Sequence, residues 1–309
     1  MNNPTVLWKN GKIVPWEEGT IHLITPATQY GRGIFEGIRF YDTDCGPAIF
    51  RLEGNEEHWA RFFYSAEVMG MKLPYSAGEL SAAVKQLVKE TGLSEGYIRP
   101  YCGDDTMGVG VKEGGGHLVV AIAIFPGYKK PNSVRATISR VKRIPPEVID
   151  MKAKISGVYV NSKFAIMDAA NRGFDDVILL DLKENVAEGY AANIFAVKSD
   201  IRGRKILFTP PRDNILPGIT RRTLITLARY SGIEVRERNF KPDFLHVADE
   251  AFFCGTAMEV MPISQIDDMP IGAETPGPIT RTLAYLYSDA VHGRLPKFSH
   301  WLTFVNKYK

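Results

Sequence analysis

The chain has 309 residues, more than one compact core usually holds, so its length predicts two domains. A hydrophobic content of 45% and a charged content of 24% are typical of a soluble globular protein. With 38 basic and 35 acidic residues, the formal net charge of +3 excludes a broad electrostatic surface for nucleic acid or membrane binding.

Three further features bound the compartment and the chemistry. The longest apolar run, 118–125, is too short to span a bilayer and predicts a buried strand. The first residues carry no charged-then-apolar leader of the secretory kind. The three cysteines, Cys45, Cys102 and Cys254, are widely spaced and predict neither a disulfide framework nor a zinc site. We therefore expect a cytoplasmic protein without a metal site.

The first part of the chain, residues 1–125, is predicted to form a smaller N-terminal α/β domain. A turn dipeptide, Asn10-Gly11, lies between two alternating stretches and predicts a hairpin over residues 5–16. Apolar spacing predicts the remaining elements: helices over 55–71 and 77–90, and strands near 48–52, 97–101 and 118–125. The polar, turn-rich segment 126–133 is the predicted linker.

The rest of the chain, residues 134–309, is predicted to form a larger C-terminal domain. The same signals predict strands over 134–141, 176–181, 193–197, 205–208, 233–235 and 251–254, and helices from Tyr159 to about 173 and over 220–230, 244–247 and 279–291. No repeat, heptad or low-complexity segment interrupts this pattern.

Several short motifs follow one another in a fixed order. They are Phe-Glu-Gly-Ile-Arg at 35–39, Tyr-Ile-Arg-Pro at 97–100, Met-Gly-Val at 107–109, Ala-Lys at 153–154, Leu-Pro-Gly-Ile-Thr-Arg at 216–221 and Gly-Thr-Ala-Met-Glu at 255–259. Each motif alone is a weak signal. Together, over residues 30–285, they resemble the fold-type IV pyridoxal-phosphate enzymes, most closely branched-chain amino-acid aminotransferases. The resemblance implies a two-domain α/β fold like that of D-amino acid aminotransferase.

Lys154 is the lysine that the resemblance assigns to a Schiff base with pyridoxal 5'-phosphate. Taken alone, a lysine is most often a solvated surface charge. Lys152 is the nearby rival, and strand alternation would put both side chains on one side. Only Lys154 has the family's five-residue step to a tyrosine, Tyr159. The resemblance therefore implies that Lys154 anchors the cofactor and then moves a proton at the substrate α-carbon.

Two further residues are assigned by resemblance to the cofactor ring. Glu188 follows Lys154 by 34 positions (188 − 154) and would face the pyridine nitrogen, keeping it protonated. Tyr159 would donate a hydrogen bond to the phenolic oxygen. Without the resemblance, Glu188 is an exposed loop glutamate and Tyr159 a core tyrosine with a satisfied hydroxyl.

The phosphate of the cofactor is assigned to two backbone turns and one arginine. Gly218, Ile219 and Thr220 open a predicted helix, whose unpaired N–H groups and dipole favour an anion. Gly255 and Thr256 follow a predicted buried strand, and Arg61 on the helix over 55–71 would complete the clamp. The alternatives are an ordinary helix N-cap and an exposed helix arginine.

The resemblance also implies a set of substrate contacts: Tyr30, Phe35, Tyr97, Arg99, Val109, Thr256 and Ala257. Backbone N–H groups of Thr256 and Ala257 would meet the substrate carboxylate, and the aromatic side chains, with Tyr159, would form an apolar pocket. Arg99 would meet the distal carboxylate of glutamate or 2-oxoglutarate. Val109 would reach the pocket of a neighbouring subunit, which implies a homodimer or a higher homo-oligomer.

The implied activity is a ping-pong transamination from leucine, isoleucine or valine to 2-oxoglutarate, so the partners are small amino acids and 2-oxo acids. D-amino acid and (R)-amine transaminases and aminodeoxychorismate lyase-type enzymes of the same fold are alternatives. A binding module that kept the fold without the chemistry is another. The chain departs from the family pattern at Ala191-Ala192-Asn193, at Val158 and at Arg32, which adds a positive charge near the expected pocket.

Overall fold

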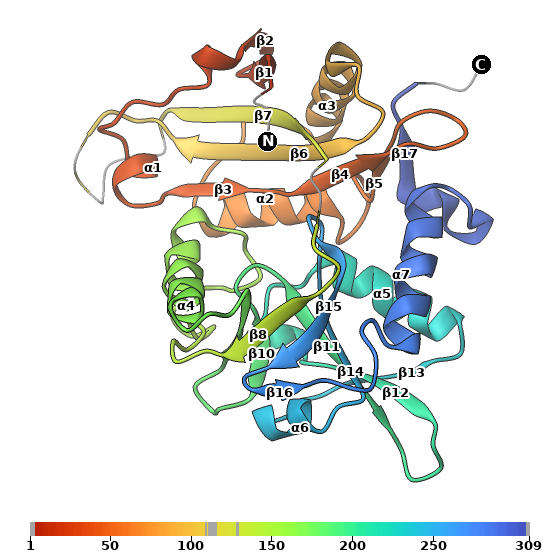
Figure 1. Ribbon diagram of the computed structural model, residues 1–309. Coiled ribbons are helices and arrows are strands. Elements are labelled where there is room, and N and C mark those ends of the chain that lie inside the picture. The colour runs from red at the N-terminus through yellow and green to blue at the C-terminus, as the bar shows by residue number, and fades with distance from the viewer. Residues whose placement is uncertain (1–3, 109, 111–115, 128–129, 307–309) are drawn as a thin grey trace. The chain divides into compact units, whose positions relative to one another are not determined.

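The computed structural model describes residues 4–108, 110, 116–127 and 130–306, and Figure 1 traces their helices and strands. The chain forms two compact units. The first holds Met1–Lys129, Ala153–Gly157 and Asp289–Lys309, and the second holds Lys130–Lys152 and Val158–Ser288.

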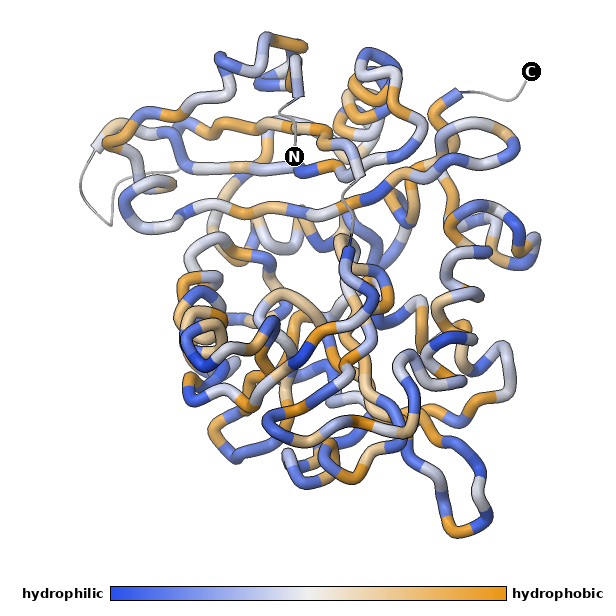
Figure 2. The backbone as a smooth tube through the Cα atoms, viewed as in Figure 1, coloured by the Kyte–Doolittle hydropathy of each residue, from blue (hydrophilic) through white to orange (hydrophobic). Residues whose placement is uncertain are grey.

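Among its described residues, the first unit contains an eight-stranded sheet in the order β17-β5-β4-β6-β7-β1-β2, with β3 paired to β6 off this path. Neighbouring strands are antiparallel. The strands are β1 Val6–Lys9, β2 Lys12–Pro15, β3 Gly33–Phe35, β4 Ile38–Tyr41, β5 Ala48–Phe50, β6 Gly96–Asp104, β7 Leu118–Pro126 and β17 Leu302–Phe304. Figure 2 shows hydrophobic colour along β7, as expected for a strand with a buried face.

The helices of the first unit are short or amphipathic. They are η1 Trp16–Glu18, α1 Pro26–Gln29, α2 His58–Val68, α3 Ala77–Thr91 and η4 Pro296–Trp301. Apolar spacing predicted α2 and α3 because each has one buried face, formed in α2 by Trp59, Phe62 and Ala66.

The predicted hairpin at Asn10-Gly11 is confirmed. Lys9 pairs with Lys12, so Asn10 and Gly11 alone make the turn, and both have positive φ angles, 46° and 93°. Two-residue hairpin turns with positive φ at both positions favour this dipeptide.

The second unit contains a nine-stranded sheet among its described residues, in the order β10-β9-β8-β15-β14-β11-β12-β13, with β16 paired to β15. Its strands are β8 Val134–Ile138, β9 Asp176–Leu180, β10 Val186–Gly189, β11 Asn193–Ser199, β12 Lys205–Thr209, β13 Glu234–Glu237, β14 Glu250–Gly255, β15 Glu259–Ile266 and β16 Met269–Pro270. Between residues 156 and 291 the helical segments are η2 Ser156–Val158, α4 Tyr159–Asn171, η3 Arg212–Asn214, α5 Ile219–Tyr230, α6 Pro242–His246 and α7 Pro278–Val291. The first residues of η2 and the last residues of α7 belong to the first unit. No described helix is long and apolar enough to cross a bilayer.

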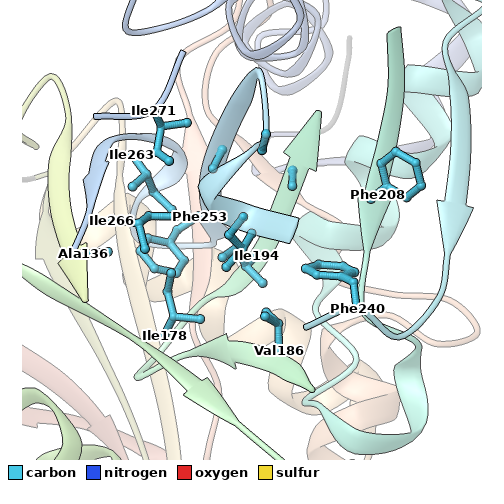
Figure 3. Close-up of a cluster of buried hydrophobic side chains, with 14 of the residues drawn as sticks. Ala136, Ile178, Val186, Ile194, Phe208, Phe240, Phe253, Ile263, Ile266 and Ile271 are labelled. Atoms are coloured by element: carbon cyan, nitrogen blue, oxygen red, sulfur yellow. The ribbon is translucent and has the colours of Figure 1, made fainter. Parts of the chain in front are cut away.

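Both faces of strand β9 are buried. Ile178 joins the cluster drawn in Figure 3, where side chains from β8, β9, β11, β14 and β15 meet. Val177 and Leu179 pack on the opposite face against Ala165 and Ala169 of α4. The unbroken apolar run of β9 follows from this double burial, because successive strand residues point to opposite faces.

The units differ from the predicted domains in two segments. The prediction places residues 153–157 and 289–309 in the C-terminal domain, whereas the structure places both in the first unit. The physical reason is backbone pairing: Ile155 forms an antiparallel bridge with Ile34, and β17 pairs with β5. Pairing between residues so far apart in sequence leaves no local pattern.

Phe253 of β14 is fully buried in the second-unit core, so Phe253→Ala is expected to lower the free energy of unfolding by about 3–5 kcal/mol. Urea denaturation of both variants measures this. Phe164→Ala is the matched control, because Phe164 on α4 is 59% exposed and its loss should change stability by less than about 0.5 kcal/mol. Equal losses in the two variants would contradict the burial.

Candidate active site

Lys154 is held by backbone bonds within the first unit. Its N–H donates to the Ser65 hydroxyl at 2.9 Å, and its C=O accepts from the Phe35 N–H at 3.2 Å. The amine lies 4.8 Å from the centroid of the Phe35 ring. Lys152 lies in a turn and is exposed, whereas Lys154 is half-buried. The two lysines therefore do not share a strand face, and Lys154 has the more enclosed environment.

Arg61 is not an exposed helix arginine. Its Nε donates to Glu36 Oε1 at 2.6 Å and its Nη2 donates to Glu36 Oε2 at 2.9 Å. The Glu36 carboxylate is 0% exposed and also meets His58 Nδ1 at 2.7 Å. Burial alone would raise the pKa of Glu36, but the Arg61 charge and the His58 hydrogen bond outweigh it and hold that pKa well below its ordinary value.

The helix α2 joins this ion pair to the lysine. Ser65 lies one turn after Arg61, and its hydroxyl donates to the Arg61 carbonyl at 2.7 Å while accepting from the Lys154 N–H. Glu36 follows Phe35 directly, and Phe35 donates its own N–H to Lys154. A continuous set of hydrogen bonds and one peptide bond thus fixes the lysine backbone and the Arg61 guanidinium together.

Three of the predicted substrate residues lie together in the first unit. Arg99 Nη2 donates to the Tyr97 hydroxyl at 2.9 Å, and the guanidinium carbon lies 4.7 Å from the Phe35 ring centroid. The Nε of Arg99 is buried and has no hydrogen-bond partner among the described residues. A buried guanidinium donor without an acceptor is costly, so this atom is suited to an anionic ligand. Tyr30, at the end of α1, is 46% exposed, and Val109 lies outside the described residues.

Glu188 lies in β10 of the second unit and is buried, which contradicts its alternative interpretation as an exposed loop residue. Arg143 Nη2 pairs with its Oε1. Asn193 Nδ2 donates to Oε2 at 2.9 Å, and the Leu216 N–H donates to the same atom at 3.2 Å. A carboxylate so supplied with donors is held in one orientation.

Asn193 links this carboxylate to the start of α5. Its Nδ2 also donates to the Leu216 carbonyl at 3.0 Å. The N-cap of α5 is Gly218, and no side chain caps this helix end. Thr220, in the first turn, is buried. The first N–H groups of a helix carry partial positive charge, so this uncapped end is suited to an anion such as phosphate.

The remaining predicted residues of the second unit lie at two chain turns. Gly255 ends β14 and pairs with Glu259 of β15, so Thr256 and Ala257 lie in the hairpin loop between these strands. Tyr159 is the first residue of α4 and is half-buried. Burial raises the pKa of the Cys254 thiol just before Gly255, which keeps this thiol protonated and unreactive.

Residues 33–266, more than half of the chain, match the family described as Amino-transferase class IV. The chain belongs to this family. The branched-chain-amino-acid aminotransferase of Pseudomonas aeruginosa is 37% identical over 306 residues, covering 97% of each chain. The predicted family and the fold-type IV architecture are confirmed.

Two solved structures of class IV relatives superimpose closely. The branched-chain aminotransferase from Thermoproteus uzoniensis with norvaline gives a TM-score of 0.90 at 38% identity, covering 98% of this chain and 99% of that chain. The branched-chain amino acid aminotransferase from Thermobaculum terrenum in its PLP-form gives a TM-score of 0.89 at 34% identity, covering 99% of this chain and 100% of that chain.

The sequence analysis assigned no role to four residues whose side chains bond the predicted ones: Glu36, His58, Arg143 and Asn193. Glu36 lies inside the Phe-Glu-Gly-Ile-Arg motif, and His58 lies three positions before Arg61 on one helix face. The place of Glu36 in a motif and the place of His58 on the Arg61 helix face are the two features of the sequence that could have indicated these residues.

The described residues contain no group of three or more His, Cys, Asp or Glu side chains arranged to hold a metal ion.

Gly218→Ala is expected to destabilise the protein by about 1–3 kcal/mol, because its new Cβ would lie 1.9 Å from Asn193 Oδ1. The displaced amide would lose its bonds to Glu188 and to the Leu216 carbonyl. Gly78→Ala in α3 is the control, since no atom lies within 4 Å of its Cβ and alanine favours a helix. Urea midpoints compare the two, and an unaffected Gly218→Ala would contradict the tight contact.

Proposed function

We propose that this chain is a pyridoxal 5'-phosphate-dependent aminotransferase that moves the amino group of L-leucine, L-isoleucine or L-valine to 2-oxoglutarate in a ping-pong reaction. The observation that carries the proposal is the half-buried Lys154, whose amine lies 4.8 Å from the Phe35 ring centroid in the same unit as the Arg61–Glu36 pair and Arg99. The class IV family and the branched-chain names of its relatives support the substrate class.

The residues present fit this cofactor. The buried, donor-rich Glu188 carboxylate would hold a protonated ring nitrogen, and Tyr159 would hold the phenolic oxygen. The uncapped end of α5 at Gly218, Ile219 and Thr220, together with Gly255, Thr256 and Arg61, would hold the phosphate. When bound, the cofactor supplies an electron sink for the bond broken at the substrate α-carbon.

The chain's own groups provide positioning and proton transfer. Lys154 would take the proton from the α-carbon and return it at the cofactor carbon, because its backbone is fixed on both sides by Ser65 and Phe35. Glu188, oriented by Arg143 and Asn193, would keep a proton on the ring nitrogen throughout.

Substrate selection is assigned to the first-unit cluster and the hairpin loop. Phe35, Tyr30 and Tyr97 would accommodate an apolar side chain, and Arg99 would accept the distal carboxylate of 2-oxoglutarate through its partnerless Nε. The N–H groups of Thr256 and Ala257 would bind the α-carboxylate. Val109 of a neighbouring subunit would complete the pocket, so we also propose a homodimer or a higher homo-oligomer. We further propose that it is cytoplasmic.

Lys154→Ala is expected to lower the leucine-dependent transamination rate by at least about 10²–10⁴-fold, because it removes the proton-transferring group. It should also abolish the spectral change that L-leucine causes in the visible band of wild type carrying the cofactor. Lys152→Ala is the matched control and should retain both signals, since Lys152 is exposed two residues away.

The same assay separates the alternatives. If the wild type responds to D-alanine or an (R)-amine and not to L-leucine, the protein is a D-amino acid or (R)-amine transaminase and the branched-chain substrate class is wrong. Pyruvate released from a single substrate would identify a lyase. Wild type that shows no band with added cofactor would overturn the proposal.

Arg99→Gln is expected to raise the KM for 2-oxoglutarate by about 10–100-fold, the worth of one charge-assisted hydrogen bond to a carboxylate. The half-reaction with L-leucine should change by less than about threefold, because leucine has no distal carboxylate to meet the guanidinium. Stopped-flow measurement of each half-reaction gives both values. Equal losses in the two halves would assign Arg99 a structural role.

A further inference from the structure

The carboxylate of Glu36 is fully buried and surrounded by donors. It accepts from Arg61 Nε at 2.6 Å, from Arg61 Nη2 at 2.9 Å and from the Gly37 N–H at 3.2 Å, and it meets His58 Nδ1 at 2.7 Å. Removing a carboxylate from water is costly, and only such complete pairing offsets the cost. An arginine on the surface needs no buried, fully paired carboxylate beside it, whereas Arg61 has one in Glu36.

His58 acts on the pair from the same helix face. Its ring is 2% exposed, and burial lowers the pKa of His58 despite the opposing effect of Glu36. A neutral imidazole beside a carboxylate donates its Nδ1 proton to that carboxylate. The trio then carries one negative and one positive charge, and His58 fixes the Glu36 oxygen that also accepts from Arg61 Nη2.

A neighbouring ion pair has the same chemistry and a different setting. Arg51 Nε and Nη2 donate to Glu57 at 2.8 Å and 2.7 Å, and both residues are buried. The Arg51 guanidinium lies 4.7 Å from the Trp301 ring centroid, and the backbone N–H of Arg51 donates to the Trp301 carbonyl at 2.7 Å. The backbone carbonyls of Arg51 and Glu57 accept from the N–H groups of His58 and Arg61. The Glu57 carboxylate bonds the Arg51 guanidinium, so Glu57→Gln alters this side-chain pair and leaves those backbone bonds in place.

We propose that Glu36, supported by His58, is a positioning residue that holds the Arg61 guanidinium in the orientation that binds the cofactor phosphate. This role rests on the proposed function. Glu36 occupies the Nε and Nη2 atoms and so prevents rotation of the guanidinium plane. It also neutralises part of the Arg61 charge, so Arg61 contributes through fixed geometry more than through net charge.

Electrostatics and positioning predict opposite results for Glu36→Gln. Removing the negative charge alone would strengthen attraction between Arg61 and a phosphate. Loss of positioning weakens it, because the glutamine amide NH2 would face the donors of Arg61, His58 and Gly37 and push the guanidinium away. The structure favours weaker phosphate binding in Glu36→Gln, since the glutamine amide has one acceptor oxygen at a place where four hydrogen bonds converge on the Glu36 carboxylate.

The test compares two ligands on the cofactor-free protein. Dissociation constants for pyridoxal 5'-phosphate and for pyridoxal, which lacks the phosphate, give a ratio that isolates the phosphate contact. Glu36→Gln should reduce this preference for the phosphorylated ligand by about tenfold or more, the worth of one charge-assisted bond. Glu57→Gln should lower thermal stability and leave the ratio within about twofold.

If Glu36→Gln does not fold, a second pair of variants at His58 tests the positioning role of Glu36. His58→Asn keeps an N–H donor toward Glu36, and His58→Leu removes it. The phosphate preference should fall by about threefold or more in His58→Leu and return in His58→Asn.

The outcomes separate this role from the function. Wild type that binds both ligands, with a ratio unchanged or raised in Glu36→Gln, overturns the positioning role alone. Wild type that binds neither ligand overturns the proposed cofactor and this role with it.

Discussion

The buried carboxylate of Glu36 is the constraint on which the first-unit site depends. It lies between Phe35, which donates to the Lys154 carbonyl, and Gly37, and it fixes two residues one turn apart on α2. Because a buried charge tolerates no loss of partners, β3, α2 and the lysine segment have one mutual arrangement. Glu36 thus bonds Arg61 directly and is linked to the Lys154 backbone through the adjacent Phe35.

The second unit uses the same principle with different atoms. Glu188 is buried and paired with Arg143, and Asn193 carries the constraint onward to the first residues of α5. One amide thereby couples the carboxylate that would meet a ring nitrogen to the helix end that would meet a phosphate. Gly218 leaves room for that amide, which explains why a side chain there is incompatible with both groups at once.

Local chemistry made much of the fold predictable. The α3 helix begins with a capping box between Ser76 and Glu79 and ends before Gly92, whose φ is 64°, so its limits follow from the residues at its two ends. Strand β15 escaped prediction, because Pro262 lacks an amide donor and disrupts the strand pattern. Strand β17 escaped because only its distant partner β5 makes it a strand.

The residues of the candidate site also divide into those that the sequence indicated and those that only the structure revealed. The order of motifs indicated Lys154, and the 34-position spacing from it indicated Glu188. The residues that hold them were assigned no role from the sequence, since a charged side chain taken alone is most often a surface group. Arg32 illustrates the point: expected to add charge near the pocket, it pairs at 3.1 Å with Asp104, which is fully buried. This ion pair neutralises much of the charge that the sequence led us to expect beside the proposed aromatic pocket. Under the proposed function, the buried Nε of Arg99, which has no hydrogen-bond partner among the described residues, would meet the distal carboxylate of 2-oxoglutarate. Phe35 and Tyr97 would accommodate an apolar side chain, so one site would serve both a branched-chain donor and a dicarboxylate acceptor.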